Sequence, residues 1–258
     1  MSIVTLLPVA AVAYLLAQLD TTLLKTVAGA TLRMILQTAV LALLLWALWY
    51  VNSYWLTAVW LAGAALAAAG VTLRRARLPQ QLLLLPTWGA TLLATVTGLG
   101  CFLVALQPDE PLAPRWVVGV AAVLLANNTA LNARGLSAYY ETLRVDSANY
   151  YTMLGNGAAR PKALTPYVRQ AVRSMMEPSA KTLTTTALIA MPMLMAGMLM
   201  GGMAPLQAAA VFVIMTVMAV FTALLALLLT IWMADKRTFN RRGEMMEILK
   251  NDKNKTED

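Results

Sequence analysis

Long apolar blocks alternate with shorter polar links along most of this chain. Most blocks approach or exceed the roughly 20 residues that a helix needs to cross the apolar core of a bilayer. Because a segment inside that core must satisfy its own backbone hydrogen bonds, each block is expected to be helical. The pattern therefore predicts an all-α, polytopic membrane helix bundle with about seven transmembrane helices. The expected spans are 3–19, 33–51, 54–73, 81–106, 116–133, 182–202 and 206–233.

The longest polar stretch is 149–181. It makes up most of the segment 135–180 between the fifth and sixth blocks, which is too long for a simple turn. Gly155, Gly157 and Pro161 interrupt it, which is typical of a turn between two helices. Downstream, Thr165 can cap a helix that has Pro166 at its first position. The pattern predicts a helical hairpin that either rests on anionic lipid or docks a partner protein.

The second helix of this hairpin is expected to be amphipathic. Val168 and Val172 fall on one side, whereas Arg169 and Arg173, four residues apart, fall together on another. The basic side is therefore available to lipid or to a partner.

Composition strengthens the membrane assignment. Hydrophobic residues make up 60% of the chain, charged residues only 12%, and the mean hydropathy is +0.66. A soluble domain of this size keeps a more polar exterior, so that class is excluded. The chain has no histidine, which removes the commonest transition-metal ligand and the commonest general base. The single cysteine, Cys101, lies inside an apolar block and allows no disulfide framework.

The positive charges predict the orientation. Nineteen of the 20 Lys and Arg residues lie in segments that the order of spans assigns to one side of the membrane. Cytoplasmic loops are rich in these residues, so the N-terminus is expected outside and the tail at 234–258 inside. The net charge of +8 is explained in this way and does not indicate nucleic-acid binding. We interpret 1–258 as one multi-pass domain of the cytoplasmic (inner) membrane, in contact with lipid.

Ionisable groups are absent from the middle of the expected spans. All 12 carboxylates fall in loops or near membrane edges. Ion-coupled carriers usually place such a group inside the membrane, so the sequence offers no proton relay for one. A membrane enzyme is disfavoured too, because paired carboxylates within a span and a nucleophile motif are lacking.

The fifth block contains three amides, Asn127, Asn128 and Asn132. Buried amides commonly form hydrogen bonds between membrane helices, and this is the slightly favoured interpretation. The alternative is that they line a polar path for a substrate.

The sixth block is rich in methionine. Met191, Met195 and Met198 would share one helical face. Thioethers bind soft ions such as Cu(I), but methionine is also a flexible apolar filler, and packing is favoured because no Cys or His completes a site. Pro192 and Gly197 should make this block bendable.

In order and spacing these residues resemble the FetB/YbbM-type permease family of ABC transporters, which includes the plant aluminium-sensitivity permeases. The family's Leu-Gly-Ala turn is similar to Leu154-Gly155 and Gly157-Ala158, and its Arg-x3-Arg-x4-Pro stretch to Arg169, Arg173 and Pro178. Further similar segments are Met191-Pro192-Met193-Leu194-Met195, the Gly202, Pro205 and Ala208 turn, and the Asn127-Asn128 pair.

The resemblance implies a permease domain over the whole chain, working as a homodimer with cytoplasmic ABC ATPase subunits. Its cargo would be a metal ion, iron first, with a nucleotide sugar as the alternative. The chain has no G-x-x-x-x-G-K-[ST] loop, so ATP and Mg are expected in the ATPase, and this chain is expected to be no enzyme and to hold no cofactor or metal.

The resemblance also suggests roles for individual residues. It implies ATPase coupling for Leu154, Gly155, Gly157, Ala158, Arg169 and Arg173. The expected substrate path comprises Asn127, Asn128, Asn132, Met191, Met195 and Met198, and the expected hinge comprises Pro178, Pro192 and Gly197.

The chain departs from the family after Pro178. Where the family shows an Asp and a Lys, this chain has Lys181 and Thr184. The resemblance therefore implies an ABC transporter permease more directly than it implies iron as the cargo. The competing class is an ATP-independent membrane protein, either a secondary carrier or a scaffold.

Overall fold

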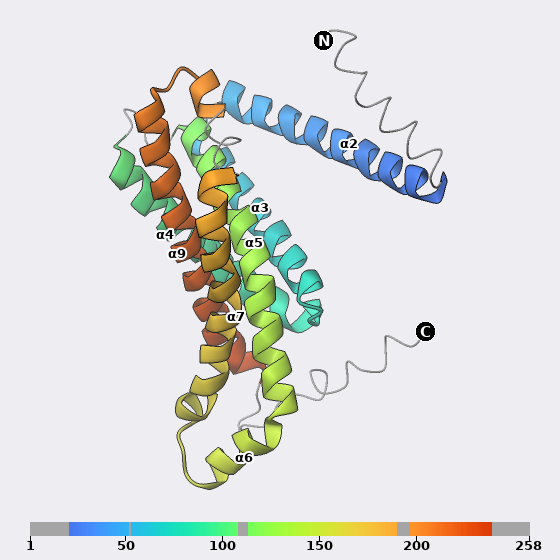
Figure 1. Cartoon of the computed structure of the whole chain (residues 1–258), viewed down its shortest axis with the longest axis vertical. Coiled ribbons are helices and arrows are strands. Elements are labelled where there is room, and N and C mark those ends of the chain that lie inside the picture. Colours follow the sequence, from blue (N-terminus) through green and yellow to red (C-terminus); the bar gives the residue numbers. More distant parts are fainter. Residues whose placement is uncertain (1–20, 52, 108–112, 190–196, 239–258) are drawn as a thin grey trace. The chain divides into compact units, whose positions relative to one another are not determined.

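The computed structural model of the chain describes residues 21–51, 53–107, 113–189 and 197–238. The regular secondary structure of these residues is helical, which confirms the predicted all-α class (Figure 1). The helices are α2 (Thr21–Val51), α3 (Tyr54–Arg75), α4 (Gln80–Leu106), α5 (Pro114–Val145), α6 (Ser147–Gly155), α7 (Arg160–Ile189) and α9 (Pro205–Thr238).

Five stretches of the described helices are long and apolar enough to cross a membrane. They are Lys25–Leu48, Tyr54–Arg75, Gln80–Leu106, Trp116–Val145 and Pro205–Asp235. These match five of the predicted spans and confirm a polytopic membrane bundle. The predicted span at 3–19 lies outside the described residues, as does 190–196 of the sixth span.

The chain divides into two units, residues 1–53 and residues 54–258. In the first unit, α2 carries apolar side chains that are mostly exposed, including Leu32, Leu36 and Leu43. A helix that is apolar and exposed suits contact with lipid.

The second unit is a bundle built around α9. This helix packs most extensively along α4 and also along α5, while α7 lies along α5, and α3 contacts both α4 and α5 (Figure 1). One apolar cluster contains Leu99, Phe102, Val120 and Leu124, near the end of α4 and the start of α5. A larger cluster fills the opposite end of the bundle.

The larger cluster brings the basic ends of several helices together. It contains Leu73 near the end of α3, Leu83 near the start of α4, Leu143 near the end of α5 and Ala234 near the end of α9. These segments are followed or flanked by arginines, so the structure gathers these residues at one end of the unit: Arg74, Arg75, Arg77 and Arg237, which are exposed, and Arg144, which is half-buried. This agrees with the sorting of charge inferred from the sequence, whereas the choice of the cytoplasm for this end remains a prediction.

One expected boundary was wrong. We predicted a helix capped by Thr165 and beginning at Pro166, and a separate membrane span beginning at 182, but α7 runs without a break from Arg160 to Ile189. Its first turn is closed by the Ala159 carbonyl, which accepts from Lys162 N at 2.9 Å and Ala163 N at 3.1 Å. Thr165 therefore lies inside the helix and donates its hydroxyl to Pro161 O at 2.9 Å, instead of capping.

The reason for this difference is that Pro161 already occupies the first turn, where a missing N–H costs nothing. Pro166 and Pro178 are both accommodated within α7. The polar hairpin and the sixth span therefore share one helix.

Helix length also explains why a hairpin projects from the bundle. The 32 residues of α5 extend about 48 Å at 1.5 Å per residue, whereas a bilayer core is about 30 Å thick. The predicted span ended at 133, but α5 continues to Val145. In Figure 1 the lower ends of α5 and α7, together with α6, extend past the end of α9.

The close approach of α4 to α9 gives a test of the packing. A Cβ atom at Gly98 would collide with Thr222 Oγ1 and lie 3.3 Å from Thr222 Cβ. We expect Gly98→Ala to lower the free energy of unfolding by about 1–3 kcal/mol through overpacking. Thermal unfolding of the detergent-purified protein measures this effect.

The matched control is Gly100→Ala on the same helix, where an added Cβ meets nothing within 4 Å. This change should be neutral or slightly stabilising, because Ala is the better helix former. Equal destabilisation by both variants would contradict the described contact between α4 and α9.

Candidate functional site

The candidate site is the 135–180 hairpin, which consists of the end of α5, α6, a short turn and the start of α7. The turn is built from backbone geometry. Gly157 has φ +82, its N–H donates to Leu154 O at 3.0 Å, and Ala158 N donates to Met153 O at 3.0 Å. This pair of bonds is a Schellman motif, in which the left-handed position favours glycine. The predicted turn between two helices is confirmed.

The start of α7 is amphipathic in the predicted way. Val168 and Val172 pack against the larger apolar cluster, and Met175 is fully buried within it. Arg169 and Arg173 are exposed, and Arg173 Nε lies 3.5 Å from Glu177 Oε2. Of the proposed coupling residues in the turn, Leu154 and Ala158 are half-buried and both glycines are exposed. The hairpin thus presents a polar, mainly basic surface on a fixed apolar base.

Tyrosine side chains hold the two limbs of the hairpin together. Tyr167 of α7 donates its hydroxyl to Asp146, at 3.0 Å to the backbone oxygen and 3.2 Å to Oδ2, at the junction of α5 and α6. Its ring meets that of Tyr150 edge-on, with centroids 6.4 Å apart. Burial and, to a lesser extent, the negative charge of Asp146 raise the pKa of Tyr167 to about 12. The hydroxyl therefore stays protonated and can donate at neutral pH.

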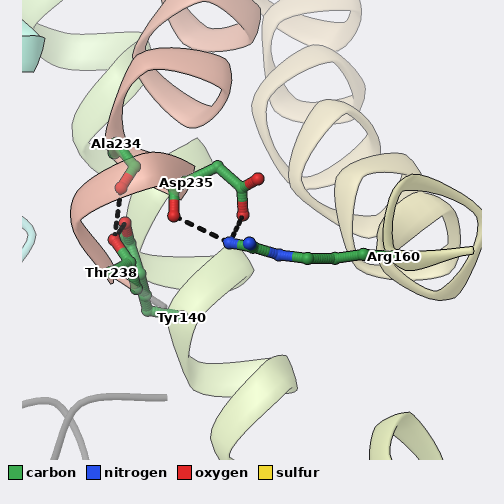
Figure 2. Close-up of polar contacts among 5 residues, drawn as sticks. All are labelled: Tyr140, Arg160, Ala234, Asp235 and Thr238. Carbon is green, nitrogen blue, oxygen red and sulfur yellow. Dashed lines mark hydrogen bonds and ion pairs between the residues drawn. The ribbon is translucent and has the colours of Figure 1, made fainter. Parts of the chain in front are cut away.

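Two further contacts connect the hairpin to the end of α9 (Figure 2). Arg160, the first residue of α7, donates through Nη2 to Asp235 Oδ1 at 2.7 Å and to the Asp235 backbone oxygen at 2.8 Å. Tyr140 of α5 meets Thr238 Oγ1 at 3.2 Å. Burial raises the pKa of Tyr150, and the neighbouring Arg160 guanidinium opposes this rise.

The three amides lie in α5, in the middle of the bundle. Asn128 and Asn132 are each 1% exposed, and Asn132 Nδ2 donates to Asn128 Oδ1 within the same helix. Asn127 Nδ2, Asn128 Nδ2 and Asn132 Oδ1 are buried without a hydrogen-bond partner among the described residues. The hydrogen bond between Asn132 and Asn128 therefore lies within α5. It does not join two helices, which was the role favoured from the sequence.

The remaining predicted residues are only partly described. Met191, Met195 and Pro192 lie outside the described residues. Met198 is half-buried and packs against the apolar cluster of Leu99 and Phe102, next to Gly197. Pro178 lies within α7. The structure does not bring Met198 together with the hairpin, which packs in the other cluster.

Sequence reasoning missed the residues that fix the hairpin in place. Two signals were available. Five of the eight tyrosines fall within 139–167, at positions 139, 140, 150, 151 and 167. Asp235 follows directly on an apolar block, where a carboxylate that is half-buried requires a partner. The partner, Arg160, is 75 residues away in sequence and could not be identified from spacing.

Comparison with known proteins places the chain among membrane proteins. The sequence model of UPF0014, described as an uncharacterised protein family, matches residues 1–239. The protein named ALUMINUM SENSITIVE 3 of Arabidopsis thaliana is 28% identical over 112 residues, which cover 43% of this chain and 41% of that protein. The UPF0014 membrane protein STAR2 of Oryza sativa subsp. japonica is 29% identical over 118 residues, covering 46% of this chain and 41% of that protein.

The chain thus spans about two fifths of the length of the curated relatives it matches. No solved structure matches it.

The Schellman turn gives a test of how the hairpin is held. Because a side chain is strained at φ +82, we expect Gly157→Ala to destabilise the turn by about 1 kcal/mol. Hydrogen exchange of the amides in 153–160 should become faster as a result. Gly155→Ala is the control, since Gly155 has helical geometry and open space around it. Unchanged exchange in Gly157→Ala would contradict the described turn.

Proposed function

We propose that this chain, which belongs to the uncharacterised protein family UPF0014, is the permease subunit of an ABC transporter. The name of its rice relative, UPF0014 membrane protein STAR2, supports a membrane role for the family. In this proposal two copies form a homodimer in the cytoplasmic (inner) membrane and bind two cytoplasmic ABC ATPase subunits. The chain exports a metal ion, with iron as the first candidate. It performs transport and leaves ATP hydrolysis to its partner.

The observation that carries this proposal is the continuity of α7. One helix, Arg160–Ile189, begins in the projecting hairpin and continues into the sixth predicted span. A partner that pushes on the hairpin therefore displaces the membrane part directly. Pro178 inside this helix removes one backbone donor and provides a place where the helix can bend.

The chemistry of the hairpin fits a protein partner with an acidic groove. Arg169 and Arg173 are exposed one turn apart on α7, while the opposite side of this helix is buried in the apolar cluster. Complementary charge increases the rate and specificity of docking. ATP and Mg belong to the partner, because the sequence of this chain lacks the phosphate-binding loop.

Several features support a small polar cargo. The buried amides Asn127, Asn128 and Asn132 retain unused hydrogen-bonding atoms that a passing solute or its water can use. The Arabidopsis relative is named ALUMINUM SENSITIVE 3, and this name refers to a metal. The name describes that relative only, and we use it as a reason to propose a metal ion as cargo here. Lys181 and Thr184 replace an Asp and a Lys expected for iron-exporting permeases, which weakens the case for iron. The resemblance to the plant permeases gives a nucleotide sugar as the alternative cargo.

Docking is tested by reversing the charge of the hairpin. We expect Arg173→Glu, which also places two carboxylates one turn apart, to weaken binding of the ATPase at least about tenfold, or about 1.4 kcal/mol. Gly157→Pro should have a similar effect, because proline cannot adopt a positive φ. Co-purification of the permease with a co-expressed ABC ATPase measures the binding.

The control is Arg75→Glu, which reverses an exposed charge at the end of α3, outside the hairpin. It should insert and co-purify normally. If both hairpin variants co-purify with the ATPase as the wild type does, the docking proposal is wrong. Cargo movement driven by an ion gradient without nucleotide would favour a secondary carrier.

The amide path is tested by the double variant Asn128→Leu/Asn132→Leu. Because both side chains already leave buried atoms unpaired, we expect the free energy of unfolding to change by less than about 1 kcal/mol. ATP-dependent uptake of iron into inside-out vesicles should be lost. Thr87→Val, which removes another buried hydroxyl without a partner, is the control. Full transport by the stable double variant would contradict the path.

A further inference from the structure

The last turn of α9 is fixed to both limbs of the hairpin. On one side, Arg160 makes two hydrogen bonds to Asp235, one to the side chain and one to the backbone oxygen (Figure 2). On the other side, Thr238 Oγ1 donates to Ala234 O at 2.8 Å, which uses its only proton. The bond between Tyr140 and Thr238 must therefore run from the tyrosine hydroxyl to the threonine oxygen.

The position of Arg160 in the chain connects its contact with Asp235 to the tip of the hairpin. It is the first residue of α7 and follows the Schellman turn by only two residues, so its backbone moves with the tip of the hairpin. The Arg160 and Asp235 side chains are 30% and 28% exposed, so this ion pair is shielded more than the surface pairs of the hairpin. A charge-assisted bond of 2.7 Å in such a setting holds geometry well.

Few other contacts connect these two helices. In the described residues α7 packs mainly on α5, and α9 packs mainly on α4 and α5, whereas α7 and α9 hardly touch each other. Displacement of α7 therefore reaches α9 by direct contact chiefly through Arg160 and Asp235.

We propose that Arg160 and Asp235 are a positioning pair that transmits movement of the hairpin to α9. This inference rests on the proposed function and adds a second route to the one along α7. When a partner displaces the hairpin, Arg160 draws the end of α9 with it, and the close packing of α9 on α4 spreads the movement through the bundle. Tyr140 keeps the same turn of α9 in register with α5.

The experiment uses the full chain in complex with its ABC ATPase and does not depend on the cargo. Spin labels at Arg75 and Arg237, both exposed, report the position of the end of α9. A second label pair, at Arg75 and Gly155, reports the position of the hairpin. Cys101 is replaced by Ser, and distances are compared with and without ADP–vanadate.

In the wild type both label pairs should shift with nucleotide. Arg160→Met removes both hydrogen bonds to Asp235, so in this variant the hairpin pair should still shift, while the shifted population of the α9 pair falls at least about fivefold, the lower end of typical coupling between sites. The exchanged pair Arg160→Asp/Asp235→Arg should restore it. A residue that only stabilised the fold would change both label pairs together.

The matched control is Glu141→Gln. It removes the negative charge from the 2.9 Å pair with Arg144, which lies within α5 alone and does not reach α9, so both shifts should remain. An α9 shift of wild-type size in Arg160→Met overturns the inference but leaves the proposed function intact. If the wild-type chain binds no ATPase, both the proposed function and this inference are overturned. If the exchanged pair does not fold, the result for Arg160→Met decides alone.

Discussion

The continuity of α7 as a single helix, in spite of the two backbone donors that Pro166 and Pro178 lack, governs how the hairpin and the bundle are connected. A helix transmits displacement along its axis because each turn is bonded to the next. Since α7 runs from Arg160 to Ile189, the polar hairpin and the apolar segment that follows cannot move independently, except by bending at a proline. Two separate helices joined by a flexible link would have lost this property.

The second requirement is that the hairpin keeps its shape beyond the bundle. A pair of helices that extends past the end of α9 has fewer neighbouring helices to pack against, so it needs apolar packing of its own. Tyrosine supplies this core, since its ring packs among apolar side chains while its hydroxyl reaches a polar partner. Tyr150 and Tyr167 illustrate this, because both rings are buried and the Tyr167 hydroxyl reaches Asp146. The exposed arginines of α7 are thus displayed on a rigid base.

Much of the fold could be predicted because apolar runs and basic links obey simple physical rules. Five spans, the turn at Gly157 and the two faces of the helix around Arg169 all follow from local pattern. The sequence prediction placed the start of α7 at the wrong residue, because Thr165 and Pro166 have the pattern of a helix start. The helix already begins at Arg160, with Pro161 in its first turn. The Arg160–Asp235 pair depends on tertiary packing and carries no local signal. The neighbours of the amides likewise depend on packing, and no spacing rule predicts them.

The docking of an ATPase on this hairpin is the central claim, and photo-crosslinking in native membranes tests it most directly. A photoreactive amino acid replaces Gln170, which is exposed next to Arg169 on α7, and another replaces the exposed Arg75 as a reference. We expect the Gln170 probe to form a product containing an ABC ATPase, identified by its phosphate-binding peptide, and the Arg75 probe to form none. Products that contain only lipid at Gln170 would contradict it.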